Sequence, residues 1–380
     1  MFTLSKKSLL LVLLVAAMPL GDVVAANNGV VKFVRKLGAA IDSAALRGAD
    51  RDYLAMPERP WQVMVRGSTN QGDLKMSTMI DGQALIGPEW GDVTMEPRLK
   101  TGVTQYVGVA ANYRGYGLCY SEDVSGSRGS LLHLSVTGGC YGLNLRIHQY
   151  KTDEPEIRLT FDNPMPTDTT FSDIIPNPIK VRTMMLDAYY FFNSKRFSYC
   201  AAYDQSIIQK RSAGSLLVGA MYYHSTIAYD QDDNAELVML MGDVGKIKHW
   251  QVSLGAGYAY NFVPCRGLLI SAMAMPTVSV YNRLDSWSYT SDFYDKMIEQ
   301  RRTGVEATFV ESDYEIRPTG HDRHTSSTTF NVDARLSITY NIGNIFFNAN
   351  GQFNHFRYSF TKQSGRFNDW YINTAIGIRL

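Results

Sequence analysis

The chain has 380 residues, of which 45% are hydrophobic and 12% aromatic, with 23 Tyr, 17 Phe and 5 Trp. Its 37 Lys and Arg against 36 Asp and Glu exclude the charge excess of a disordered chain or a nucleic-acid-coating protein. Tyr outnumbers Phe, and together with 31 Gly this suggests strands that have one wet side and one apolar side.

The N-terminus has the pattern of a Sec signal peptide, which we predict over residues 1–25. Lys6 and Lys7 precede an apolar run over 9–17, and small residues follow up to Ala25 and Ala26. The run is too short for a membrane anchor, which needs about 20 apolar residues. No later stretch reaches about 18 apolar residues, so a helical membrane protein is excluded. An exported soluble protein or a transmembrane β-barrel remains.

Residues 26–58 are predicted to form a periplasmic N-terminal segment with an amphipathic helix. Val30, Phe33, Val34, Leu37 and Ile41 recur at roughly helical spacing within 29–47. We expect a helix that caps the periplasmic rim, and the alternative is a plug that gates the lumen.

Residues 59–380 are predicted to form an all-β, antiparallel transmembrane barrel. Even residues from Trp370 to Leu380 share one face and odd residues from Tyr371 to Arg379 share the other, because side chains alternate along a strand. The same alternation recurs along the chain and gives about twelve strands under the even-number rule. They span roughly 61–81, 99–113, 116–122, 130–137, 141–150, 180–192, 213–228, 246–262, 267–282, 329–341, 345–361 and 367–380.

The connections separate into short turns on one side and long loops on the other. This is the bacterial barrel pattern, with short turns in the periplasm and long loops outside, and it places both termini in the periplasm. Residues 196–212 do not fit the strand count. We interpret them as a periplasmic or lumen-facing excursion, or as an extension of the seventh strand.

The inward face of these strands carries the candidate lumen-lining residues. Polar side chains in register are expensive in a dry core but suit a wet or hydrogen-bonded lumen. The candidates are Asn144, Arg146, His148, Gln251, Ser253, Asp333, Arg335, Asn348, Asn350, Gln352, Asn354 and Arg379.

Gln209, Lys210 and Arg211 form the densest polar run in the irregular segment. A solvated turn is the simpler interpretation. The functional alternative is a lumenal constriction, in which the two cations would favour anions or lipid phosphates.

Residues with metal or nucleophile chemistry give weak signals. His321 and His324 have metal-like spacing but lie in the longest expected outer loop. His224 and Ser225 are adjacent on a strand and therefore point to opposite faces, so they cannot form a base and a nucleophile. We expect no enzymatic activity, no metal and no cofactor.

Four cysteines are too few and too scattered for a disulfide scaffold. One bridge is possible, but the sequence specifies none among Cys119, Cys140, Cys200 and Cys265.

Several motifs resemble those of a catalogued family, domain of unknown function 4421. The clearest run from Phe197 to Tyr203 and from Gln209 to Ser215, and others begin at Tyr53, Tyr113, Gly138 and Gly257. The resemblance covers about Tyr53 to Leu380. It implies an outer-membrane barrel of Bacteroidota and supplies no activity.

We therefore expect an integral outer-membrane barrel that is a non-enzymatic narrow channel, transporter or structural component. The alternatives are a barrel enzyme that acts on outer-membrane lipid, and a surface adhesin or partner-binding barrel, suggested by the aromatic and acidic loop from Trp287 to Arg323. Expected partners are outer-membrane lipids and the barrel-assembly machinery, without nucleic acid. The substrate, the pore state and the oligomeric state stay open.

Overall fold

The computed structural model describes most of the chain after residue 47. The described residues are 48–80, 93–100, 103–126, 129–152, 156–161, 167–172, 178–230, 238, 243–291, 316–325, 328–359 and 363–380. The expected signal peptide and N-terminal helix lie outside these residues. Within them, no helix has the length and apolar character needed to cross a membrane.

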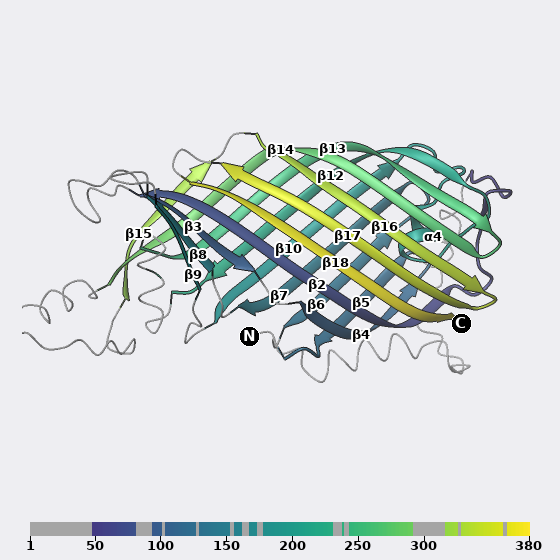
Figure 1. Cartoon of the computed structure of the whole chain (residues 1–380). Coiled ribbons are helices and arrows are strands. Elements are labelled where there is room, and N and C mark those ends of the chain that lie inside the picture. The colour runs from purple at the N-terminus through teal and green to yellow at the C-terminus, as the bar shows by residue number, and fades with distance from the viewer. Residues whose placement is uncertain are drawn as a thin grey trace, which may run out of the picture.

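Twelve antiparallel strands form a closed barrel, in agreement with the sequence-based prediction (Figure 1). The ring closes where the last strand pairs with the first over seventeen residue pairs, from Gln363 opposite Thr78 to Arg379 opposite Gln62. In chain order the strands are β2 (Trp61–Ile80), β4 (Thr104–Tyr113), β5 (Tyr116–Asp123), β6 (Ser130–Thr137), β7 (Tyr141–Thr152), β10 (Ile179–Phe191), β12 (Ala213–Ala228), β13 (Val244–Cys265), β14 (Leu268–Ser291), β16 (Phe330–Ile342), β17 (Ile345–Ser359) and β18 (Gln363–Arg379).

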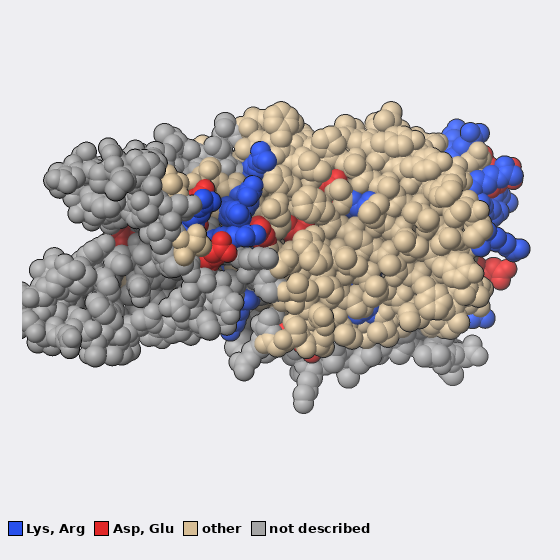
Figure 2. All heavy atoms as spheres, viewed as in Figure 1, with Lys and Arg blue, Asp and Glu red and all other residues tan. Residues whose placement is uncertain are grey.

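Side chains alternate between the outside and the inside of the barrel. On β18, Ile372 and Ile376 are 50% and 60% exposed, whereas Asn373 and Ala375 between them are buried. The outward apolar residues form a band, and Lys and Arg gather beyond both of its edges (Figure 2). Such a band between charged rims is typical of a barrel that spans a bilayer.

The two ends of the barrel differ in their connections. At the short-turn end, Arg114 and Gly115, Gly267, and Gly343 have positive φ in tight hairpin turns. At the long-loop end, segments expected to be loops contain further strands. β3 (Val93–Lys100) pairs with β2, β8 (Glu156–Phe161) with β3, β9 (Thr167–Ser172) with β8, and β15 (Ile316–Thr325) with β14.

The irregular segment 196–212 turns into the barrel from the short-turn end. It contains one helical turn, α4 (Tyr199–Tyr203), which lies inside the ring of strands (Figure 1). It ends in β11 (Ile208–Gln209), which pairs with β1 (Leu54–Ala55). Of the interpretations that the sequence left open, the segment is therefore a lumen-facing excursion, and we call it the plug segment.

Candidate functional site

The barrel interior is the candidate site, and the structure places the predicted lumen-lining residues there. All twelve are buried except Asn350, which is partly buried and donates to the amide oxygen of Asn348. These side chains therefore lie on the inward face of their strands.

A charged layer crosses the lumen between β16 and β10, two strands that are not neighbours. Arg335 forms an ion pair with Asp187 and lies beside Asp333 at 3.5 Å. The guanidinium also donates to the hydroxyl oxygens of Tyr199, at 2.7 Å, and of Tyr189. The Tyr189 hydroxyl donates in turn to Asp333 at 2.7 Å. One buried cation therefore joins two buried carboxylates from opposite walls.

A second ion pair crosses the same layer. Arg146 on β7 pairs with Asp369 on β18, and its guanidinium lies 4.2 Å from the ring centroid of Tyr371. The Tyr371 hydroxyl donates to Gln352, whose amide donates to Asp333 at 2.9 Å. Buried charges are tolerated when they are paired and hydrogen-bonded, and this layer supplies both conditions.

An apolar layer follows towards the long-loop end. The Tyr223 ring from β12 stacks on Phe356 of β17 and Phe367 of β18, with centroids 4.6 and 5.3 Å apart. Strands from opposite walls thus meet through aromatic rings. Further buried members of the same cluster are Leu74, Met76, Ile227, Ile247 and Leu284.

The plug segment occupies the interior at the short-turn end. Ser198 caps α4 by accepting from the Ala201 amide at 3.3 Å. The Tyr199 ring stacks between Phe191 and Tyr203, with centroid distances of 5.3 and 4.7 Å. Because Tyr199 also contacts Arg335, the plug segment and the charged layer form one continuous structure.

The barrel wall holds the plug segment through its backbone carbonyls. The Ala202 oxygen accepts from Ser337 at 2.6 Å and from Asn348 at 3.1 Å, and the Gln205 oxygen accepts from Arg379 at 3.0 Å. These donors satisfy carbonyls that a single helical turn leaves free. The lumen-facing polar residues of β16, β17 and β18 therefore act as anchors.

Burial raises the pKa of several groups of the plug segment, among them Asp204 and Cys200. Desolvation raises the pKa of Asp204 to about 6, although hydrogen bonds from Ser206 and the charges of Arg66 and Arg379 oppose the shift. Desolvation also raises the pKa of the Cys200 thiol to about 12. The thiol is therefore protonated and unreactive at neutral pH.

The three residues of the candidate constriction, Gln209, Lys210 and Arg211, do not lie together in the structure. Gln209 is buried and accepts from the Asn261 amide inside the barrel, at 3.1 Å. Lys210 and Arg211 are exposed at the short-turn end, where Lys210 donates to the Arg51 carbonyl and Arg211 lies over the Tyr53 ring. The structure does not bring the two cations into the lumen, because the chain turns outward after Gln209 to begin β12.

Several residues of the charged layer were not singled out from the sequence. Asp187, Tyr189, Tyr199, Asp369 and Tyr371 lie in it. Asp187 and Tyr189 lie on a predicted strand, where they alternate with outward residues. The alternation could therefore have identified both as inward-facing. Tyr199 carried none, since it lies in the segment whose path was unknown.

The residues considered for catalysis or metal binding do not form a common site. Ser225 is buried, while His224 stacks on the Trp250 ring at 4.8 Å and lies within 3.0 Å of the His249 carbonyl. His321 lies 3.3 Å from Asp285 and stacks on Trp287. Across the described residues, no group of three or more His, Cys, Asp or Glu is arranged to hold a metal ion.

All four cysteines are free. Cys119 and Cys200 are buried, Cys140 is partly buried and Cys265 is exposed in a hairpin turn. No disulfide therefore contributes to the fold.

Comparison with models of protein families gives one match. The model described as domain of unknown function 4421 matches residues 95–378. The chain belongs to this family. The resemblance found in the sequence is thereby confirmed, while the bacterial lineage that it implied stays a prediction. A comparison with curated proteins found no significant match.

Solved structures with a similar fold include several outer-membrane barrels. The outer membrane protease OmpT of Escherichia coli is 8% identical, with a TM-score of 0.42 over 85% of this chain and 97% of its own. The translocator domain of the autotransporter NalP from Neisseria meningitidis is 8% identical, with a TM-score of 0.30 over 92% and 96% of the two chains. The toluene transporter TodX of Pseudomonas putida is 8% identical, with a TM-score of 0.25 over 84% and 90%. None of these likenesses is close enough to assign an activity.

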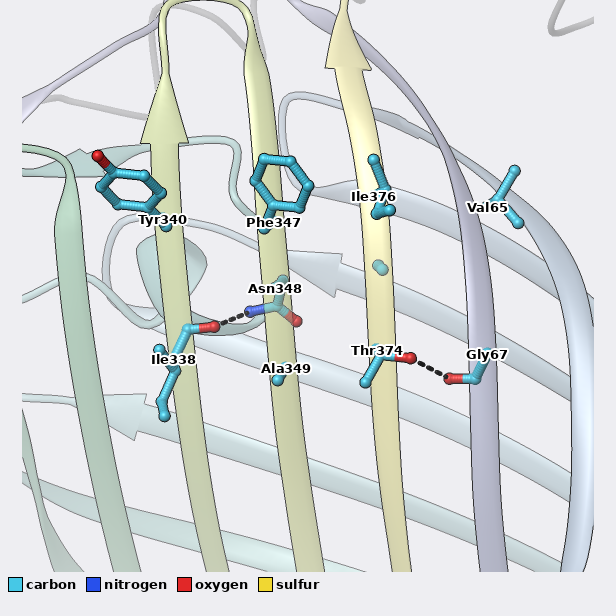
Figure 3. Close-up of a pocket in the computed structure, with 10 residues that line it drawn as sticks. Val65, Gly67, Ile338, Tyr340, Phe347, Asn348, Ala349, Thr374 and Ile376 are labelled. Atoms are coloured by element: carbon cyan, nitrogen blue, oxygen red, sulfur yellow. Dashed lines mark hydrogen bonds between the residues drawn. The ribbon is translucent and has the colours of Figure 1, made fainter.

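The outer face also carries a hollow near the short-turn end (Figure 3). It is lined by Val65, Gly67, Tyr340, Phe347 and Ile376 among others, on β2, β16, β17 and β18. Small residues such as Gly67 leave space between larger apolar side chains. In a bilayer, acyl chains fill such a depression, so we assign it to the lipid-facing band.

Proposed function

We propose that the chain is an integral outer-membrane barrel with a closed lumen, which acts as a non-enzymatic structural or partner-binding component. An apolar outward band between charged rims supports a membrane location, and the expected signal peptide supports export. Short turns then face the periplasm and the long-loop end faces outward.

The closed lumen is the observation that carries this proposal. The plug segment, the charged layer and the apolar layer fill the interior one after another. The plug segment is hydrogen-bonded to the wall, and each of the other two layers joins strands that are not neighbours in the ring. Passage of a solute would require paired charges and stacked rings to separate at every layer. Of the functions expected from the sequence, a structural or binding role needs none of these rearrangements.

A gated transporter is the second candidate, because the plug segment enters the lumen from one end and is held there by polar contacts. If it moves out, it removes the Tyr199 hydroxyl from the charged layer. None of the three stacked rings of the apolar layer, Tyr223, Phe356 and Phe367, belongs to the plug segment. Under the closed-barrel proposal this layer alone still blocks the lumen.

Planar-bilayer recordings on three forms of the full chain separate the candidates. The wild type and a variant lacking residues 198–206 are both expected to show no steady conductance. A variant that combines this deletion with Tyr223→Ala, Phe356→Ala and Phe367→Ala, and also with Arg146→Ala, Asp187→Ala, Arg335→Ala and Asp369→Ala in the charged layer, is expected to conduct. Heat-modifiable gel migration checks that each form is folded.

Steady conductance of the wild type would contradict the closed lumen. Conductance of the deletion variant alone would favour the gated transporter, because the plug segment would then be the barrier.

A further inference from the structure

A row of cations crosses four neighbouring strands on the outside of the barrel, near the long-loop end. Arg357 of β17 lies opposite Arg366 of β18, Arg366 opposite Lys75 of β2, and Lys75 opposite Arg98 of β3. We call these four residues the cationic row. Their inward-facing neighbours, such as Phe356 and Phe367, are buried, which places the row on the outward face.

This arrangement is unfavourable without counter-charges. Like charges directly opposite each other on neighbouring strands are destabilising, and the row contains three such pairs in succession. Arg98 is paired with Asp73, at 2.8 Å. Among the described residues, no ion pair to Lys75, Arg357 or Arg366 is found. The row therefore has unused capacity for anions.

The row borders a hollow of about 780 Å³. Five of its lining side chains are cationic and two are acidic: Lys75, Arg98, Arg158, Arg357 and Arg366, against Glu96 and Glu156. Lys and Arg are visible along the loop-side edge of the apolar band in Figure 2. An anion can thus approach the row from outside the barrel.

The position of the row indicates where the anion comes from. Four residues closer to the short-turn end, Phe353 of β17 lies opposite Trp370 of β18, also on the outward face. Aromatic side chains mark the boundary between acyl chains and headgroups. The cations therefore lie at the depth of the headgroups, next to surface that faces lipid.

We propose that the cationic row binds the phosphate groups of a lipid headgroup in the outer leaflet. Arginine can hold a phosphate through two parallel hydrogen bonds, and lysine adds a compact charge. Three interstrand spacings give the row a length of roughly 14 Å, enough for more than one phosphate. The choice of leaflet rests on the orientation in the proposed function.

Native mass spectrometry of the full-length protein in dodecyl maltoside, titrated with bis-phosphorylated lipid A, tests the proposal. Lys75→Gln combined with Arg366→Gln is expected to weaken binding about tenfold. The matched control combines Lys195→Gln with Arg266→Gln, which removes the same charge from exposed residues at the short-turn end. The control is expected to bind like the wild type, and gel migration verifies folding.

Further arms identify the source of the phosphate. Lipid A from which both phosphates have been removed is expected to bind at least about tenfold more weakly to the wild type. Inorganic phosphate that competes at the same concentration as the lipid would contradict a lipid ligand. Equal lipid binding by the wild type and the row variant would overturn the proposal. These results are independent of conductance, so they do not depend on whether the lumen is closed.

Discussion

Individual buried polar residues decide how the interior of this barrel is held together. Arg335 satisfies two carboxylates that would otherwise be buried and unpaired, and Asp204 is a buried carboxyl in the plug segment. The Asn112 amide donates to Asp204 at 3.3 Å, and no cation lies within ion-pair distance of it among the described residues. Desolvation therefore dominates its titration.

Asp204 is expected to make stability depend on pH. Its folded pKa of about 6 lies above the ordinary value of 3.8, so the folded state binds the proton more tightly than the unfolded state. Stability from this group is full below the ordinary pKa and is lost as pH rises through 6. Between pH 7 and pH 5, the free energy of unfolding should rise by about 1.4 kcal/mol.

Urea unfolding of the wild type and of Asp204→Asn in phospholipid vesicles measures this effect. The Asn variant should lack the contribution, so the difference between the two proteins should change over this pH range. A constant difference between pH 5 and pH 7 would show that Asp204 titrates elsewhere.

At the scale of elements, the close approach of neighbouring strands explains why two positions on β13 are glycine. On β13, an added Cβ at Gly257 would meet the backbone carbonyl oxygen of Ala274 on β14, and one at Gly255 would meet that of Pro276. Their spacing reflects backbone packing between two long strands.

Gly257→Ala is expected to destabilise the barrel by about 1–3 kcal/mol, because a backbone oxygen cannot move aside as a side chain can. Gly351→Ala is the matched control, since its added Cβ would lie at an ordinary 3.5 Å from the nearest atom, the Tyr371 oxygen. Urea unfolding in vesicles compares the two. Equal stability of both variants would contradict close approach at Gly257.

For the whole molecule, the outward apolar band defines which residues lie in the membrane. Leu336, near the middle of β16, is 64% exposed, and Ile345 begins β17 beside the turn at the short-turn end. The two leucine-sized side chains face outward at different depths of the band.

Leu336→Arg should cost about 2–4 kcal/mol of folding free energy in a bilayer, and Ile345→Arg about 0–1 kcal/mol, because the cost of a charge falls towards the interface. Guanidinium unfolding in phosphatidylcholine vesicles measures both. A similar loss of folding free energy in the two variants would show that Leu336 and Ile345 do not lie at different depths in the membrane.

The alternation of side chains made much of the fold predictable. It located the strands of the barrel and the inward residues such as Asn144, Arg335 and Gln352, because the period of a strand is a local property. It assigned no face to Lys210 and Arg211, because their segment has no regular period.

The sequence by itself determined that the chain forms a barrel and which side chains face inward. Only the tertiary structure decided which of them meet across the lumen, because Arg335 and Asp187 are 148 residues apart and Arg146 and Asp369 are 223 apart. Such contacts depend on the closure of the ring and on the register between strands, which no local pattern encodes. The same dependence placed the plug segment inside and aligned the cationic row outside.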